Sequence, residues 1–171
     1  MTRLMNMLTR GVVALAKPTT KMQALQMRLT HGEVKDSMEH LEPYGFTSCP
    51  HEGAEGLAAF MGGDRSHGVV VVVADRRYRL TALQAGEVAI YTDEGDKIHL
   101  KRGRIIDIET GTLNIRAATA VNIDAPVINQ TGRIVSQGDQ VAGGVSQINH
   151  LHAGVKQGTD QSGAPIPGGG A

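Results

Sequence analysis

The 171-residue chain carries 17 Lys and Arg residues and 17 Asp and Glu residues, so its formal net charge at pH 7 is zero. This balance provides no large basic surface, which argues against nucleic acid as a partner. With three Tyr, two Phe and no Trp, the core must be aliphatic, which favours narrow β-structure over a broad globular core. The single cysteine, Cys49, excludes a disulfide within one chain; such a residue is usually small and buried, and we assign it no role.

Residues 1–30 have apolar side chains at helical spacing, and the pattern predicts an N-terminal helix that Pro18 ends or interrupts. Its apolar positions are Leu4, Met7, Leu8, Gly11, Val12 and Leu15. After Pro18, the apolar residues up to Leu29 fit a second helix and a first strand equally well. The run Gly11–Ala16 is too short for a secretory signal, so we expect a mature N-terminal segment, and no apolar stretch is long enough to span a bilayer.

Residues 31–90 are expected to form a compact β-domain, because Gly, Pro, Asp and Ser interrupt a series of short apolar runs. The most apolar run, Val69–Ala74, indicates a buried strand. Tyr78, Leu80 and Ala82 alternate with polar neighbours, as in a further strand. Short strands with such turns predict a small barrel, of the OB type, with a short helix at Ala54–Met61.

Residues 91–147 change character, because apolar residues now occur in i, i+2 pairs that begin every seven or eight positions. The pairs are Ile98/Leu100, Ile106/Ile108, Leu113/Ile115 and Val121/Ile123. Each pair is typical of a short strand with one thin apolar face. At about 25 cal/mol per Å², two aliphatic side chains cannot offset an ordering cost of about 1.5 kcal/mol per residue. The pattern therefore predicts a β-helix in which copies bury one another's faces or, equally, an antiparallel meander packed on the first domain.

The sequence Asn149-His150-Leu151-His152 is the sharpest candidate for a metal site. In an extended strand His150 and His152 project to the same side. Two imidazoles are too few ligands, but three chains on a threefold axis would supply six nitrogens, which suits an octahedral first-row metal such as iron better than tetrahedral zinc. Most isolated His-x-His pairs are surface histidines, so the spacing leaves both interpretations open. The other histidines lack ligand spacing and are expected to be solvated or structural: His31, His40, His51, His67 and His99.

No catalytic motif is convincing, and we do not expect an enzyme. Asp93, Glu94 and Asp96 are predicted to form the tip of a hairpin rather than a pair of acid/base carboxylates. The chain contains neither a phosphate-binding loop nor a Gly-x-Ser-x-Gly elbow.

Two stretches resemble the baseplate central spike proteins of Mu-like and P2-like contractile phages. One runs from Gly86 through Leu100 to Ile106, and the other is His150-x-His152-x-Gly154-Val155 with Gly158 and Ser162-Gly163-x-Pro165. The resemblance covers nearly the whole chain and implies an all-β protein with an N-terminal OB-like barrel, a trimeric intertwined β-helix and a metal-bound apex. The segments it implies are 1–30 (helical or extended), 31–90 (OB-like domain), 91–147 (shaft) and 148–171 (apex).

The resemblance also implies a function. The protein would be a homotrimeric, membrane-piercing spike at the tip of the virion tail baseplate, made in the host cytoplasm. It would contact the tail hub and, transiently, the host outer membrane, without a nucleic-acid or small-molecule substrate. His150 and His152 of each chain would hold one iron ion on the trimer axis, where calcium or chloride is also compatible with the family. Two alternatives remain: a β-solenoid that degrades polysaccharide, and the tip protein of a related secretion apparatus.

Overall fold

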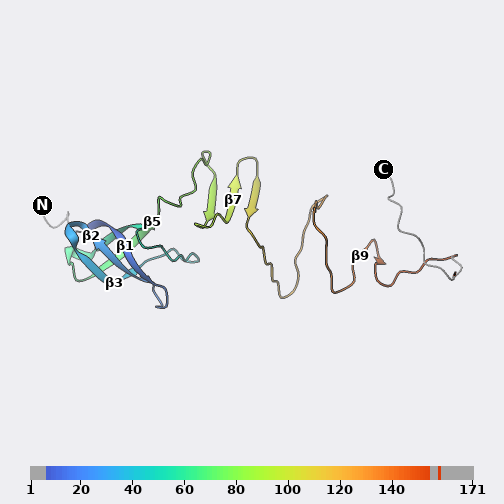
Figure 1. Cartoon of the computed structure of the whole chain (residues 1–171), viewed down its shortest axis with the longest axis horizontal. Coiled ribbons are helices and arrows are strands. Elements are labelled where there is room, and N and C mark those ends of the chain that lie inside the picture. The colour runs from blue at the N-terminus through green and yellow to red at the C-terminus, as the bar shows by residue number, and fades with distance from the viewer. Residues whose placement is uncertain (1–6, 155–157, 159–171) are drawn as a thin grey trace. The chain divides into compact units, whose positions relative to one another are not determined.

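The computed structural model describes residues 7–154 and 158, which form two units that divide after residue 116 (Figure 1). The prediction of an all-β chain is confirmed within these residues, since the only helical elements are two 3-10 turns, η1 (Thr30–Gly32) and η2 (Met61–Gly63). None of the described helices is long and apolar enough to cross a membrane.

The first part of unit 1 is a closed five-stranded barrel. Its strands are β1 (Leu8–Lys17), β2 (Ala24–Leu29), β3 (Val34–His40), β4 (Glu55–Phe60) and β5 (Gly68–Ala74). They follow one another in the order β1-β2-β3-β5-β4, and β1 closes the barrel by pairing with β4. All neighbours are antiparallel except β3 and β5, which are parallel at Glu39↔Val69 and His40↔Val70. Closure leaves no open edge for another chain to extend.

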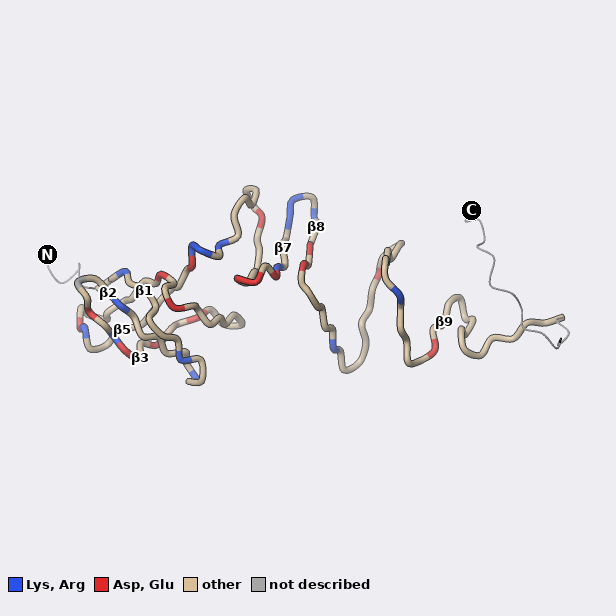
Figure 2. Tube along the Cα trace, in the orientation of Figure 1, with Lys and Arg blue, Asp and Glu red and all other residues tan. Residues whose placement is uncertain are grey.

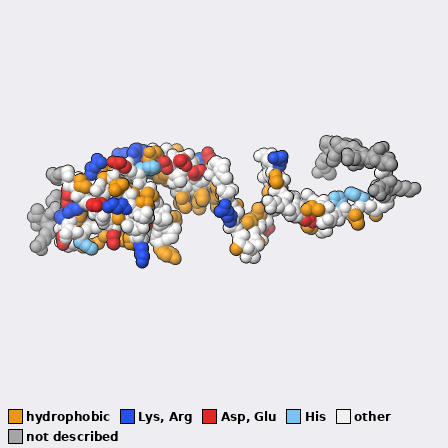
Figure 3. Space-filling view, turned by 60° about the horizontal axis from the view of Figure 1, so that its bottom comes forward, with side chains coloured by type: hydrophobic (Ala, Val, Ile, Leu, Met, Phe, Trp, Pro, Cys, Tyr) orange, Lys and Arg blue, Asp and Glu red, His pale blue; other side chains and the backbone are white. Residues whose placement is uncertain are grey.

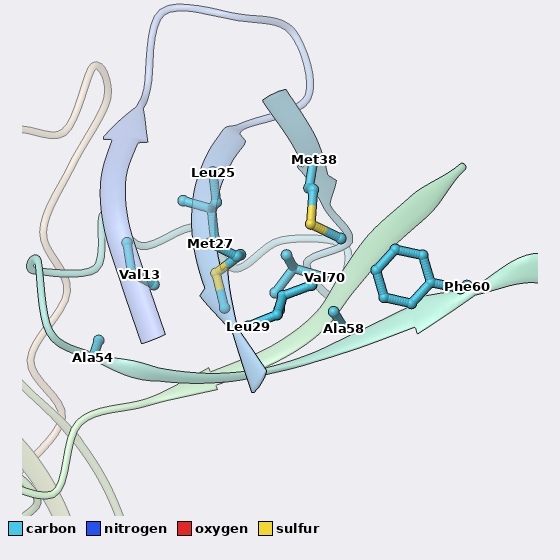
Figure 4. Close-up of a cluster of buried hydrophobic side chains, with 9 residues drawn as sticks. All are labelled: Val13, Leu25, Met27, Leu29, Met38, Ala54, Ala58, Phe60 and Val70. Atoms are coloured by element: carbon cyan, nitrogen blue, oxygen red, sulfur yellow. The ribbon is translucent and has the colours of Figure 1, made fainter. Parts of the chain in front are cut away.

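The barrel interior is filled by aliphatic side chains and one aromatic ring (Figure 4). The nine side chains of this cluster are Val13, Leu25, Met27, Leu29, Met38, Ala54, Ala58, Phe60 and Val70. Alternate residues of β4 point inward, and Phe60, 1% exposed, is among the largest fully buried side chains. Gly68 leaves room for the ring, because a Cβ atom there would lie 2.5 Å from the Cε1 atom of Phe60. The few aromatic residues in the sequence thus still contribute one central core residue.

The two helices predicted from the sequence are wrong within the described residues. Residues 8–17 form strand β1, which pairs on one side with β2 and on the other with β4. A bulge between Val13 and Leu15 shifts the alternation of β1, so its apolar spacing resembled that of a helix. Residues 55–60 form β4, whose small Gly and Ala residues fit the narrow interior rather than a helix.

Other local predictions have mixed outcomes. Residues 24–29 are a strand, and the strand expected at Val69–Ala74 is β5. Its predicted burial holds for Val69 and Val70 but not for Val71 and Val72, which are about half exposed. Residues 78–82 form no strand in the barrel-to-sheet connection. Cys49 is exposed rather than buried, because it lies in the loop between β3 and β4.

Unit 1 continues into an antiparallel sheet of β6 (Val88–Tyr91), β7 (Lys97–Lys101) and β8 (Ile105–Glu109). The strands predicted at Ile98/Leu100 and Ile106/Ile108 are confirmed as β7 and β8. The acidic residues 93–96 form the tip of the β6–β7 hairpin, as expected, with the Thr92 N–H donating to the Asp96 carbonyl at 3.0 Å. Leu113 and Ile115 follow β8 in an unpaired segment.

Within unit 2, the described residues from 117 onward are mostly extended and unpaired. The exception is a hairpin of β9 (Val141–Ala142) and β10 (Val145–Ser146). Gly143 and Gly144 connect these strands with φ angles of 58° and 83°, which suits a tight two-residue hairpin turn. No strand is formed at Val121/Ile123 in the single chain, and both side chains are exposed.

Replacing Phe60 by Ala should destabilise the barrel by about 3–5 kcal/mol, because it removes a fully buried ring and leaves a cavity. Phe46→Ala is the matched control: Phe46 is 64% exposed, and its loss should change the free energy of unfolding by about 0.5 kcal/mol or less. Chemical denaturation followed by circular dichroism measures both values. Equal effects of the two substitutions would contradict the assignment of the core.

Candidate functional site

The segment that carries the His-x-His motif is held by the β9–β10 hairpin. The Ile148 N–H donates to Oδ1 of Asp139 at 3.1 Å, and the Gln147 N–H donates to the Gln140 carbonyl at 2.9 Å. A hydrogen bond from the Ser146 hydroxyl lowers the pKa of Asp139, assisted by backbone N–H groups that include that of Ile148. The Asp139 carboxylate therefore fixes the backbone immediately before the histidines.

His150 and His152 lie side by side, as the i, i+2 spacing predicted. Their ring centroids are 4.9 Å apart and the rings are inclined at 80°. Nδ1 of His150 lies 2.9 Å from the Ser146 carbonyl oxygen. Because a carbonyl can only accept, Nδ1 carries the proton in this contact, which leaves Nε2 as the ring nitrogen that could bind a metal. A histidine oriented by such a hydrogen bond is the usual form of a metal ligand.

One chain cannot complete a metal site around these two histidines from the residues that the structure describes. In that part of the chain, no group of three or more His, Cys, Asp or Glu side chains is close enough to hold a metal ion. The imidazole chemistry fits a first-row transition metal, and the described part of one chain supplies only these two imidazoles toward such a site. The remaining motif residues Val155, Ser162, Gly163 and Pro165 lie outside the described residues.

A second candidate site is the apolar face of the β6–β7–β8 sheet. Strand register places Val88, Leu100 and Ile106 in one row and Ile90, Ile98 and Ile108 in the next. These six side chains, called the aliphatic face below, are each 41% to 64% exposed. Figure 3 shows how much hydrophobic side-chain surface the chain leaves open to solvent. A contiguous patch of this kind marks a contact surface.

The opposite face of the same sheet is polar. Lys97 Nζ lies 2.6 Å from a Glu109 oxygen, and Lys101 Nζ lies 2.8 Å from a carboxylate oxygen of Asp107. The residues of these ion pairs alternate along the strands with those of the aliphatic face. One side of the sheet is therefore mainly polar and suited to solvent, whereas the other side is apolar.

Contacts that the sequence did not reveal hold the start of this sheet in place. The Glu87 carboxylate accepts hydrogen bonds at 3.0 Å from the backbone N–H groups of Arg102 and Gln84. These bonds, that from Arg102 first, lower the pKa of Glu87, and Nε2 of His99 lies 3.2 Å from the same carboxylate. The only local signal is Gly86, whose φ of 87° suits a tight turn.

Two further histidines, His51 and His40, have structural contacts outside any shared metal site. His51 Nε2 lies 3.1 Å from Oδ2 of Asp93, which connects the β3–β4 loop to the β6–β7 turn. His40 is buried beside Oε1 of Gln23 at 3.2 Å, and burial lowers its pKa. These contacts fit the expectation that neither histidine is a metal ligand.

Comparison with known proteins identifies the family. The model of the family Bacteriophage Mu Gp45, N-terminal, matches residues 10–77, which include most of the barrel. The chain is 36% identical over 177 aligned positions to the baseplate puncturing device gp45 of Escherichia phage Mu, covering 93% of this chain and 89% of that protein. The chain belongs to the phage Mu gp45 family. It is also 34% identical to the Mu-like prophage FluMu protein gp45 of Haemophilus influenzae, covering 94% of this chain and 91% of that protein. The resemblance to Mu-like baseplate proteins is thus confirmed over 93% of this chain or more.

The hairpin before the histidines should lose order in acid. Because the folded-state pKa of Asp139 lies below its ordinary value of 3.8, its stabilising effect is complete above that value and is lost as the pH falls through the lowered pKa. Hydrogen exchange of the Ile148 amide should therefore accelerate in strong acid beyond its intrinsic pH dependence. Asp139→Asn should remove most of that extra dependence, whereas an unchanged profile in this variant would refute the role of the carboxylate.

Proposed function

We propose that this protein is the central spike of a contractile phage or phage-like tail, a homotrimer that pierces the host outer membrane. Homology to a protein named a baseplate puncturing device, over 93% of this chain, supports a structural role at the tail baseplate. The observation in the structure that carries the proposal is the aliphatic face, which a single chain leaves exposed.

Burial of the aliphatic face gives the copies a physical reason to associate, and a threefold arrangement would bury it completely. Three copies arranged around an axis enclose one face from each copy, so each chain completes the core of the other two. Beyond β8 the exposed aliphatic residues continue through Leu113, Ile115, Val121 and Ile123. We infer that these residues wind with their counterparts into an intertwined β-helix, in which every backbone edge is paired.

The barrel supports the same architecture. Its strand order, with the parallel contact between β3 and β5, fits a Greek-key barrel of the OB type. We place the docking surface for the tail hub on this barrel, because it has its own closed core and does not need the aliphatic face for stability.

The two histidines would clamp the other end of the assembly. His150 and His152 from three chains would provide six imidazole nitrogens for one iron ion on the axis. The bound ion would cross-link three chain ends and so stabilise the trimer over separated chains. Within each chain, the Ser146 carbonyl orients His150 and the Asp139 carboxylate fixes the approach to it. Calcium or chloride on the same axis has no specific residue here to support it.

The mechanical function follows from these parts. A spike must transmit force without fraying, and chains that share one core cannot separate one at a time. No specific observation favours a polysaccharide-degrading enzyme, because Asp93 in the acidic turn is paired with His51. The same architecture would serve as the tip of a related secretion apparatus, and the homology to a phage baseplate protein favours the phage tail.

Ile108→Asp should disrupt the trimer, because it places a charge in the enclosed face. Ile105→Asp is a closely matched control: both isoleucines are 53% exposed and lie on β8, but they point to opposite faces of the sheet. Sedimentation of the wild type and of Ile105→Asp should give three times the mass of one chain at micromolar concentration. Ile108→Asp should give a smaller species, and a wild-type monomer would refute the proposed assembly.

The double substitution His150→Ala and His152→Ala should abolish metal binding and leave most of the shaft folded. Elemental analysis of purified trimer should find one iron per three wild-type chains and none in this variant. His67→Ala, which removes an exposed histidine of the barrel, should retain the full metal content. Equal iron in all three proteins would remove His150 and His152 as ligands.

A further inference from the structure

The two turns that flank β7 carry opposite charges. The β6–β7 turn contains Asp93, Glu94 and Asp96, and the β7–β8 turn contains Arg102 and Arg104, next to Lys101 at the end of β7. Figure 2 shows the acidic turn at one end of β7 and the basic turn at the other. We call them the acidic turn and the basic turn.

Two of these six charges are already paired within the chain. Asp93 pairs with His51, and Lys101 pairs with Asp107. Within the described part of the chain, four charged side chains of these turns make no ion pair: Glu94, Asp96, Arg102 and Arg104. Asp96 is partly buried, and the other three are exposed. Two negative and two positive side chains are thus available to a partner.

The two turns cannot neutralise each other within one chain. Strand β7 has five residues, which at about 3.4 Å per residue separates its ends by about 17 Å. This distance is about twice the screening length of about 8 Å at physiological ionic strength. Any strong attraction must therefore come from another molecule.

A second copy of this chain is the partner that fits. This step rests on the proposed trimer, in which the aliphatic face of each sheet points to the axis. Each sheet then forms one side of a three-sided tube, and β7 crosses that side from one corner to the next. Rotation by 120° brings the acidic turn of one copy to the corner occupied by the basic turn of its neighbour.

We propose that Glu94 and Asp96 of each copy form ion pairs with Arg102 and Arg104 of the next copy at all three corners. A single exposed ion pair contributes little, but complementary charges repeated around the axis select one register and orientation. A neighbour docked upside down would bring acid against acid and base against base. The aliphatic face supplies the attraction between copies, and the corners determine how they align.

Charge reversal tests the proposal. One variant carries Glu94→Lys and Asp96→Lys, so both of its turns are basic; the other carries Arg102→Glu and Arg104→Glu, so both are acidic. Each alone should raise the concentration at which the trimer dissociates by about tenfold or more. The variant with all four substitutions should restore dissociation to within about threefold of the wild type.

Mixing the two variants that each reverse one turn shows whether the charges act between chains or within a single chain. If the turns pair between copies, chains with two basic turns and chains with two acidic turns should form mixed trimers in preference to trimers of one kind. Native mass spectrometry would resolve the mixed and unmixed trimers. A defect in the folding of the individual sheet would not be repaired by mixing. The preference should disappear in about 1 M salt, where charges are screened within about 3 Å.

The outcomes distinguish this proposal from the one on which it rests. A wild-type trimer whose dissociation is unaffected by either reversal, with no preference in mixtures, overturns the corner pairing and leaves the trimer in place. A wild-type monomer refutes the trimer itself. Circular dichroism of each variant at matched concentration checks that the barrel is still folded.

Discussion

The structure depends on an aliphatic face that one chain cannot shelter from water. The barrel core is complete without it, since Phe60, Leu25 and Val70 are buried by the barrel's own strands. The sheet has no comparable cover: Ile98 and Ile108 pair across β7 and β8, and yet both remain about half exposed. In the proposed trimer, the chain combines a barrel that buries its own core with a segment whose stability requires other copies. Folding of that segment and assembly become one equilibrium that depends on concentration.

Short polar contacts connect these two kinds of structure. Next to the first strand of the sheet, the Glu87 carboxylate accepts hydrogen bonds from the backbone N–H groups of Arg102 and Gln84. The contact between His51 Nε2 and Asp93 Oδ2 connects a barrel loop to the first turn of the sheet. Such contacts fix where the aliphatic face begins, so the copies that cover it can start in a common register.

The sequence predicted those features that depend on neighbouring residues. The i, i+2 pairs gave β7 and β8, and the same period placed His150 and His152 side by side. The predicted N-terminal helix failed because β1 is defined by hydrogen bonds to strands far along the chain, with a bulge at Val13 that disguises its alternation. The contacts of Glu87 span up to 15 residues, and no local pattern encodes them. The proposed metal site would draw ligands from several chains, so the sequence of one chain could indicate only its own share, His150 and His152.

A shared core also creates a hazard before assembly. A monomer with exposed aliphatic strands and unpaired edges can associate in wrong registers, and such segments are protected when charges flank them. Strand β7 is bounded by acidic residues on one side and basic residues on the other. The acidic turn of one chain repels the acidic turn of another, and the same holds for the basic turns. Association that brings identical turns together is therefore disfavoured. In the proposed threefold arrangement the same charges would attract a neighbouring copy, so the turns that keep single chains apart would favour the assembly that buries the aliphatic face.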